Sequence, residues 1–265
     1  MGQPTMAFEP SVTLQVSTDD CDGSCAETVV RIAAANDACD MCEIRLRHCG
    51  PDGGRLRLAG QAKAWPAAIT LADFLVANLA SALTGWRVLE LGCGLGLPGF
   101  VCAVLGADVL LTDVVEACPL LQSRVKQNAP QLRGTVQVCP LSWGADAASA
   151  AMANYGNYDL VICSDCVYEP LYGKSWRPLA ESVTAFCRAG SVALVSVQRR
   201  DGEFEDAVDG VDKFLKAAEE MMPTISVTKV FVSTPLEIYR LERQECPTLA
   251  AVVEATGMEQ HKQQQ

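Results

Sequence analysis

Residues 88–99, VLELGCGLGLPG, place four glycines directly after a short apolar run. Glycines at such a turn let the backbone approach a bound nucleotide, and the start of a following helix favours negative charge. Counted from Gly94, the spacing Gly-x-Gly-x-x-Gly is the dinucleotide pattern, which would indicate hydride transfer. Counted from Glu90, the same letters give an acidic strand end before a glycine turn, which is a second way to hold a nucleoside cofactor.

The neighbouring residues favour the frame that begins at Glu90. The apolar strand pattern stops at Leu91, whereas the dinucleotide frame would extend the strand by two residues. An acidic strand end followed by Gly92, Gly94 and Gly96 is the pattern with which many methyltransferases hold S-adenosylmethionine. These letters alone leave both cofactors open.

Two further strand ends carry side chains suited to a nucleoside, since ligands of open α/β sheets bind beyond the carboxyl ends of the strands. Asp113 closes an expected strand at 108–113, where a carboxylate can accept hydrogen bonds from both ribose hydroxyls. Trp143 follows an expected strand at 135–141. Its indole can lie against an adenine ring, or it can simply pack in the core.

Asp165 and Tyr168 form a D-x-x-Y arrangement after an expected strand at 158–165. A carboxylate beside the cofactor can orient a positively charged substrate amine, with the phenol fixing its direction. The alternative for Asp165 is a helix cap. Cys163 and Cys166 also spell C-x-x-C across this strand end, but they fit packing better than a redox pair.

These side chains need strands and helices that alternate along the chain. Apolar runs predict strands at 86–91, 108–113, 135–141, 158–165 and 191–197. Helical spacing predicts helices at 66–85, from about 98, at 117–128, 175–188 and 211–222. Pro66 suits the first turn of the first helix, and Gly85 is expected to end it. Near-continuous apolar strands separated by helices indicate a parallel sheet covered on both faces.

The last two expected strands, at 224–232 and 236–243, are joined by a link too short for a crossover helix, so they must pair antiparallel. A doubly wound α/β sheet of seven strands with an antiparallel last pair is the Rossmann-like plan of class I methyltransferases. A dinucleotide fold usually continues with parallel units. The ending therefore also favours S-adenosylmethionine.

We expect one methyltransferase domain at 21–250, between a loose N-terminal tail at 1–20 and a C-terminal tail at 251–265. Within it, 21–60 holds N-terminal strands and a β-hairpin extension, and 61–250 is the catalytic core.

The extension is expected to contain a strand at 28–34 and a hairpin at 42–60 around turn residues 51–54. The hairpin side chains expected to point inward are Ile44, Leu46, Leu56 and Leu58, and those expected to point outward are Arg45, Arg47, Arg55 and Arg57. The outward face suits either solvent or a partner.

The net charge of −11 argues against a nucleic-acid partner, because binding phosphates needs clustered Lys and Arg. No apolar run approaches the roughly 18 to 20 residues of a membrane span, and residues 1–10 have no signal-peptide pattern. We therefore expect that the protein binds neither nucleic acid nor membrane, and we expect a monomer. The expected location is the cytoplasm, with the nucleus as a second one.

Thirteen cysteines are an odd number, and several lie in apolar strand-like runs, so reduced thiols are the favoured interpretation. A zinc site is the alternative for the N-terminal group, where Cys39-x-x-Cys42 has ligand spacing. The other members of that group are Cys21, Cys25, His48 and Cys49. Because nothing else in the segment resembles a zinc knuckle, we expect no metal.

Six motifs in order carry a resemblance to methyltransferase family 16 from about residue 65 to 243. They are WPAAITLADFL, VLELGCGLGLPG, GADVLLTD, LSWG, SDCVYEP and LEIYRLER. Members of this family mostly methylate lysines, and occasionally histidine, on non-histone proteins. The resemblance therefore implies an S-adenosylmethionine-dependent protein-lysine methyltransferase with a lysine-bearing protein as its partner.

The resemblance also implies a role for each strand-end residue. The expected cofactor contacts are Trp65, Glu90, Gly92, Gly94, Gly96, Asp113, Trp143 and Ser164, and the expected catalytic residues are Asp165 and Tyr168. Glu90 and the loop glycines would contact the methionine end of the cofactor, Asp113 its ribose, and Trp143 its adenine. The sequence departs from many relatives at Ser142, where they have another polar or an acidic residue. The Cys-rich segment before Ala64 matches no family element.

The implied reaction is in-line transfer of a methyl group to a neutral amine. Because the cofactor is already activated, catalysis would rest mainly on alignment, and a pocket of low polarity would lower the lysine pKa from about 10.4. A methyltransferase acting on histidine or a small amine would share every cofactor feature. A NAD-dependent oxidoreductase and a non-catalytic adaptor are the remaining alternatives.

Overall fold

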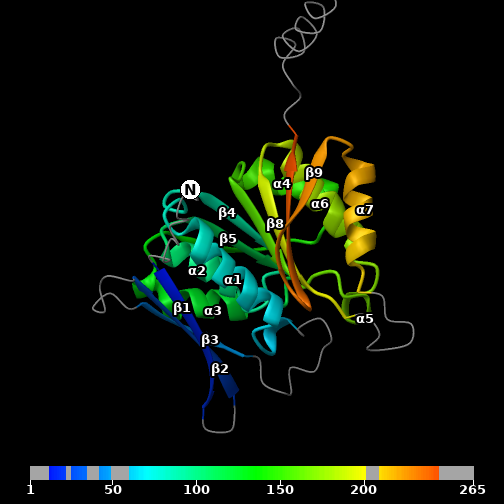
Figure 1. The fold of residues 1–265 in the computed structure, drawn as a ribbon. Helices are drawn as coiled ribbons and strands as arrows, with labels where there is room; N and C mark the ends of the chain where they lie inside the picture. The colour runs from blue at the N-terminus through cyan, green and yellow to red at the C-terminus, as the bar shows by residue number, and fades with distance from the viewer. Residues whose placement is uncertain (1–11, 22–24, 35–41, 49–59, 201–208, 245–265) are drawn as a thin grey trace, which may run out of the picture.

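The computed structural model describes residues 12–21, 25–34, 42–48, 60–200 and 209–244. Within them the chain forms a seven-stranded sheet between two layers of helices, and a smaller three-stranded sheet packs beside one layer (Figure 1). No helix of this described part is long and apolar enough to cross a membrane.

The large sheet is the one that the apolar runs predict. Its strands are β4 (Arg87–Leu91), β5 (Asp108–Asp113), β6 (Val136–Pro140), β7 (Leu160–Ser164), β8 (Val192–Gln198), β9 (Ile225–Ser233) and β10 (Leu236–Arg243), in the order β6-β5-β4-β7-β8-β10-β9. The strands from β4 to β8 are parallel, and β10 runs antiparallel to both of its neighbours. The predicted antiparallel ending is confirmed.

Both faces of this sheet are buried. Val88 and Leu89 follow one another in β4, and they belong to two different hydrophobic clusters because successive side chains of a strand point to opposite faces. The first face is covered by α1 (Pro66–Leu79), α2 (Leu97–Val104) and α3 (Cys118–Asn128), and the second by α4 (Ala145–Tyr155), α6 (Trp176–Arg188) and α7 (Val211–Met221) (Figure 1). A short helix, α5 (Glu169–Tyr172), follows β7.

The helix predictions need two corrections. The first helix begins at Pro66 as expected but ends at Leu79, before Gly85, because a turn region separates it from β4. The helix α4 was not expected: its small alanine-rich residues give little helical periodicity, and only Ala148 and Ala151 are buried.

The small sheet contains β1 (Val12–Cys21), β2 (Cys25–Ala34) and β3 (Cys42–Arg47), all antiparallel. The prediction of a loose tail at 1–20 is wrong from Val12 onward, because Leu14 and Val16 pack against the core beside α1. The strand expected at 28–34 is confirmed as part of β2.

One arm of the expected hairpin is present as β3, whereas residues 49–59, with the expected turn and second arm, lie outside the described residues. Ile44 and Leu46 are fully buried, and Arg45 and Arg47 are exposed, as predicted. At the edge of β3, the Asn128 amide of α3 accepts a 2.9 Å hydrogen bond from the N–H of Arg45 and donates a 2.8 Å bond to its carbonyl.

Eight cysteines of the described residues are free thiols: Cys42, Cys93, Cys102, Cys118, Cys139, Cys163, Cys166 and Cys187. Cys39 and Cys49 of the zinc alternative lie outside the described residues. In the described part of the chain, no three His, Cys, Asp or Glu side chains are grouped to hold a metal ion.

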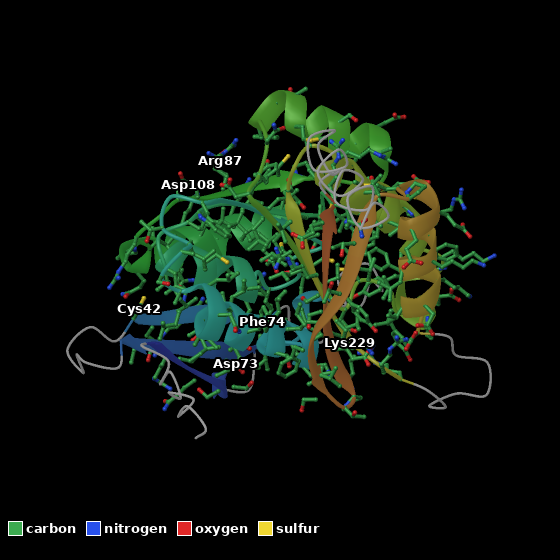
Figure 2. The ribbon with its side chains drawn as sticks, turned by 45° about the horizontal axis from the view of Figure 1, so that its top comes forward. Cys42, Asp73, Phe74, Arg87, Asp108 and Lys229 are labelled. Atoms are coloured by element: carbon green, nitrogen blue, oxygen red, sulfur yellow. The ribbon has the colours of Figure 1, made fainter. Side chains whose placement is uncertain are left out.

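The two ends of the parallel strands carry different side chains. Arg87 and Asp108 begin β4 and β5 and lie together at one edge of the molecule (Figure 2). Glu90 and Asp113, near the other ends of the same strands, are largely removed from solvent. The carboxyl ends of the strands therefore hold the candidate site.

Candidate functional site

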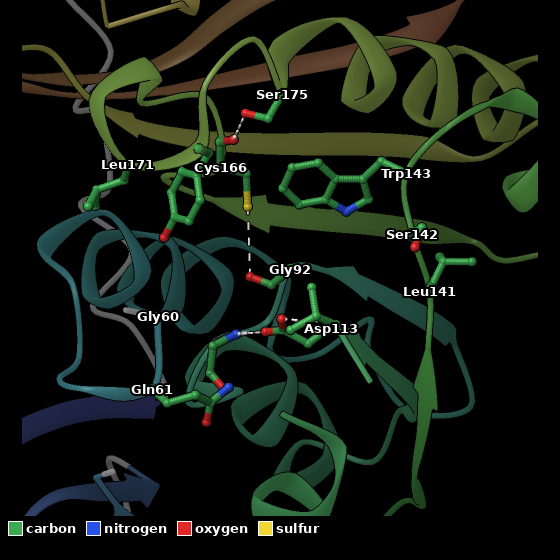
Figure 3. A pocket seen from close by; sticks show the side chains of 13 residues that line it. Gly60, Gln61, Gly92, Asp113, Leu141, Ser142, Trp143, Cys166, Leu171 and Ser175 are labelled. Carbon is green, nitrogen blue, oxygen red and sulfur yellow. Dashed lines mark hydrogen bonds between the residues drawn. The ribbon is translucent and has the colours of Figure 1, made fainter. Parts of the chain in front are cut away.

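A cavity of about 370 Å³ lies beyond the carboxyl ends of β4 and β5 (Figure 3). Its lining residues are Gly60, Gln61, Gly92, Gly94, Asp113, Val114, Leu141, Ser142, Trp143, Cys166, Leu171, Tyr172 and Ser175. This volume falls within the range of about 300–1,000 Å³ typical of small-molecule sites. The cavity brings together four of the predicted cofactor contacts: Gly92, Gly94, Asp113 and Trp143.

The loop after β4 is shaped by its glycines. β4 ends at Leu91, as the frame that begins at Glu90 requires. Gly92 has a φ of +61°, and a Cβ added there would lie 2.7 Å from the Trp143 ring and 2.9 Å from the Cys166 sulfur. A side chain at this position would therefore fill space between the loop and the wall of the cavity.

Asp113 ties the end of β5 to this loop. Its Oδ2 accepts a 2.8 Å hydrogen bond from the N–H of Gly94, and its Oδ1 accepts a 2.7 Å bond from Val114. Burial raises the pKa of the Asp113 carboxyl, and the two N–H donors oppose this shift. The carboxylate lies at the cavity wall, where it can accept further hydrogen bonds from a polyhydroxyl ligand.

Trp143 packs against the core and also forms part of the cavity wall. It is half-buried against the core on the α6 side of the sheet, and it lines the cavity. Figure 3 shows its ring reaching toward Cys166, opposite Gly60 and Gln61. Ser142 also lines the cavity, beside Leu141. A flat apolar wall with a neighbouring hydroxyl suits a planar heterocycle.

Two predicted cofactor contacts support the loop without lining the cavity. Glu90 is fully buried, where its Oε2 accepts a 2.9 Å hydrogen bond from the N–H of Gly99, and its Oε1 has no hydrogen-bond partner among the described residues. Burial raises the pKa of Glu90 well above its usual value. Gly96 is the N-cap of α2 and packs against Leu111 and Phe100.

The third glycine of the dinucleotide frame has a packing role. A Cβ on Gly99 would lie 2.4 Å from the Leu111 side chain and 2.6 Å from Glu90 Oε2. Gly99 therefore lets α2 lie close to the sheet. This close packing accounts for the fourth glycine of the motif, and no contact with a pyrophosphate is needed to explain it.

A second, narrow cavity of about 30 Å³ adjoins the first. Both cavities are lined by Gly60, Gly92, Gly94 and Tyr172, so they meet at the glycine loop. The narrow cavity adds three predicted residues: Trp65, Ser164 and Asp165. The structure thus places the expected donor side and the expected acceptor side in two cavities that share four lining residues.

Asp165 is held in an unusual conformation. Its φ is +56°, and it is the one non-glycine residue with positive φ in the described part of the chain. Arg200 forms a bidentate ion pair with its carboxylate, with 2.9 Å between Nη1 and Oδ1. Asp165 therefore pairs with a cation of the protein itself. Neither the expected contact with a substrate amine nor the alternative of a helix cap predicted this ion pair.

Tyr168 lines neither of the two cavities. The Arg200 guanidinium lies over the Tyr168 ring, with 4.3 Å between Arg200 Cζ and the ring centroid. Tyr172, one helical turn further, lines both cavities instead. The D-x-x-Y spacing therefore leads to one carboxylate at the cavity and one phenol behind it, because the chain turns between the two.

Sequence reasoning missed a buried polar chain behind the loop. Gln61 donates a 2.6 Å hydrogen bond to the Gly94 carbonyl, and its own carbonyl accepts a bond from Arg124. Arg124 also donates a 2.8 Å bond to the carbonyl of Arg47 in β3. Both side chains are almost fully buried. Their only sequence signal is polarity within otherwise ordinary segments.

Cys163 and Cys166 are free, buried thiols. Hydrogen bonding with Cys163, followed by burial, raises the pKa of the Cys166 thiol well above its usual value. This agrees with a packing role.

The family model described as lysine methyltransferase matches residues 57–220, which is more than half of the chain. This range contains both cavities and all of the predicted site residues.

Two of the relatives described below are named as lysine methyltransferases, and the third has a different name. Protein N-lysine methyltransferase METTL21A of Danio rerio is 42% identical over 54% of this chain and 63% of its own length. EEF1A lysine methyltransferase 3 of Mus musculus is 40% identical over 45% of this chain and 49% of its own length. Secreted RxLR effector protein 48 of Plasmopara viticola is 37% identical over 55% of this chain and 79% of its own length. The chain thus spans about half to two-thirds of the two named methyltransferases.

Solved structures agree on the fold. The T. thermophilus 16S rRNA N2 G1207 methyltransferase, in complex with AdoMet and guanosine, has a TM-score of 0.50 and 16% sequence identity. The alignment covers 87% of this chain and 51% of that one. At this identity the likeness concerns the Rossmann-like methyltransferase architecture alone.

Proposed function

The chain belongs to the lysine methyltransferase family, and from this premise we propose that it transfers a methyl group from S-adenosylmethionine to a lysine side chain of a non-histone protein. One observation carries the proposal. The cavity lined by Asp113 and Trp143 meets the cavity lined by Asp165 at the glycine loop. A donor and an acceptor could thereby approach one another at the glycine loop.

The larger cavity fits the proposed cofactor in its chemistry. Asp113 offers a carboxylate for ribose hydroxyls, Trp143 offers a flat surface for adenine, and Gly92 offers backbone without a side chain. When bound, S-adenosylmethionine supplies a methyl group that its sulfonium already activates. The protein therefore needs to align the two reactants and exclude water.

Asp165 is the proposed acceptor contact. Its Oδ1 accepts from Arg200 and, over 3.4 Å, from the N–H of Gln198, while its Oδ2 accepts from Arg200. An ionised carboxylate offers about four acceptor positions, so about one remains for an amine N–H. This hydrogen bond would orient the amine nitrogen, and its lone pair would stay available for attack on the methyl carbon.

The lining of the narrow cavity is partly apolar. Trp65, Ala64 and Leu95 line it together with the glycine loop, beside the polar Lys63, Ser164 and Asp165. An ammonium group loses hydration on entering such a space, which lowers its pKa and favours the neutral nucleophile. The net charge of −11 would favour encounter with a basic protein surface, in a salt-dependent way.

The test is incubation of the purified protein with S-adenosylmethionine labelled in the methyl group and a whole-cell lysate, followed by mass spectrometry of the labelled proteins. We expect label on lysine side chains. Asp165→Asn should lower transfer about 100-fold and retain cofactor affinity, since Asn tolerates the left-handed conformation. Label on histidine or on a small amine would show that the acceptor is that group and not lysine. Nicotinamide cofactor retained through purification would instead favour the oxidoreductase.

A further inference from the structure

Arg200 touches both members of the D-x-x-Y arrangement. It follows β8, the parallel neighbour of β7, so that its side chain can reach back to the residue after β7. The guanidinium pairs with both Asp165 oxygens and lies 4.3 Å from the centre of the Tyr168 ring. The Asp165 and Arg200 side chains are only 9% and 7% exposed, so this cluster is screened from solvent.

The Asp165 backbone depends on this environment. A positive φ is unfavourable for a residue with a Cβ, and such residues persist where surrounding contacts fix them. The Asp165 N–H donates a 2.8 Å hydrogen bond to the Ser196 carbonyl of β8, and its carboxylate is held from the same strand end by Gln198 and Arg200. The contacts from β8 therefore define where this carboxylate lies at the narrow cavity.

The ion pair also changes what Asp165 can bind. A lone buried carboxylate would stabilise the ammonium form of a lysine, and an ammonium nitrogen has no lone pair for attack. Arg200 balances the charge of Asp165 and leaves about one acceptor position free. An amine can then be oriented by a hydrogen bond without being held as an ion.

We propose that Arg200 is a positioning residue of the acceptor site, which fixes the Asp165 carboxylate and balances its charge so that the substrate amine binds in its neutral form. This inference rests on the proposed function, because it concerns the acceptor of that same reaction. Arg200 acts through Asp165 and Tyr168 and lines neither cavity itself.

The test is a double-mutant cycle with Arg200→Met, Asp165→Asn and the double variant, on a lysine-bearing protein substrate identified with labelled cofactor. Arg200→Met should lower kcat/KM about 100-fold, largely through kcat, and Asp165→Asn should cause a similar loss. Because Arg200 acts through Asp165, the double variant should lie within about threefold of Asp165→Asn alone. Affinity for S-adenosylhomocysteine, measured by calorimetry, should change by less than about threefold in all variants.

Arg200→Lys keeps the charge but not the bidentate geometry, so it should recover about tenfold of the lost kcat/KM. It also serves if Arg200→Met folds poorly. The matched control is Arg199→Met, which makes the same change one residue away. Arg199 pairs with Glu237 and Tyr239 at 2.9 Å and touches neither Asp165 nor Tyr168 in the contacts described. It should keep kcat/KM within about threefold.

Three results would overturn the role of Arg200 while leaving the proposed function intact: full activity of Arg200→Met, multiplicative losses in the double variant, or an equal loss of cofactor affinity. A wild-type protein that transfers no label to lysine would overturn the proposed function itself, and the role of Arg200 with it. The two failures are distinguished by the wild-type reaction alone.

Discussion

The backbone N–H of Gly94 donates a 2.8 Å hydrogen bond to the Asp113 carboxylate, so the loop after β4 is fastened to the end of β5. One side chain thereby serves the shape of the loop and the wall of the cavity together. We expect replacement of Asp113 to lower the affinity for the ligand more than it lowers the rate of catalysis.

Asp113→Ala should weaken S-adenosylmethionine binding about 100-fold, because a carboxylate that accepts two hydroxyl donors contributes charge-assisted hydrogen bonds. Isothermal titration calorimetry measures the effect. The matched control is Asp108→Ala at the start of the same strand, where the carboxylate accepts a bond from Thr135 at an exposed position (Figure 2). Affinity that stays unchanged in Asp113→Ala would remove this residue from the site.

Gly92→Ala should abolish measurable cofactor binding and lower the melting temperature, since the added Cβ meets Trp143 and Cys166 at 2.7 and 2.9 Å. Gly85→Ala, at the other end of β4, is the control: Gly85 also has positive φ, but a Cβ there meets no atom of the described residues within 4 Å. The control should lose only about 1–2 kcal/mol of stability from the left-handed conformation. If both variants bind equally well, the close approach at Gly92 is not needed for the ligand.

Trp143→Ala should weaken cofactor binding about 10- to 100-fold, as stacking on an aromatic ring contributes about 1–3 kcal/mol per base. Trp143→Phe should restore much of this affinity, because a ring remains. Trp86→Ala is the control in a different cavity, where Trp86 lies with Phe74 and Leu79. A loss in Trp143→Ala that Phe does not reduce would indicate packing alone.

Glu90→Gln should stabilise the protein increasingly as the pH rises above about 4.5. In the folded state burial holds the Glu90 pKa well above the usual 4.5, so the folded protein keeps a proton that the unfolded chain releases. Wild-type stability therefore falls by about 1.4 kcal/mol per pH unit between 4.5 and the folded pKa, and the glutamine variant lacks this loss.

Urea denaturation at pH 4, 5, 6 and 7 compares the two proteins. The control is Glu219→Gln, which makes the same substitution at an exposed position of α7. A constant difference for Glu90→Gln would mean that Glu90 is ionised in the folded protein.

The parallel sheet was predictable because its strands are short apolar runs, and because Leu91 and Asp113 mark where two of them end. The antiparallel last pair followed from a link too short for a crossover. Strand β1 was missed, since Leu14 and Val16 alternate with polar residues over too few positions, and their burial depends on α1. Local patterns record the period of an element but not the surface that covers it.

The same limit applies to the site. Gly92, Gly94, Asp113 and Asp165 follow strand ends, and the topology alone brings them to one edge. The partnership of Asp165 with Arg200 spans 35 positions and has no motif, so only the neighbouring strands β7 and β8 reveal it. The D-x-x-Y spacing predicts Tyr168, whereas the path of the chain into α5 brings Tyr172 to the cavities.

The polar chain from Arg47 through Arg124 and Gln61 to Gly94 has a consequence for how the molecule comes apart. Separation of the small sheet would withdraw the Arg47 carbonyl from a buried guanidinium and the Arg45 backbone from the Asn128 amide. Val30, Ile32 and Ile44 would lose the core that they share with α1 and α2. We therefore expect the N-terminal strands to unfold together with the glycine loop after β4, as parts of one cooperative folding unit.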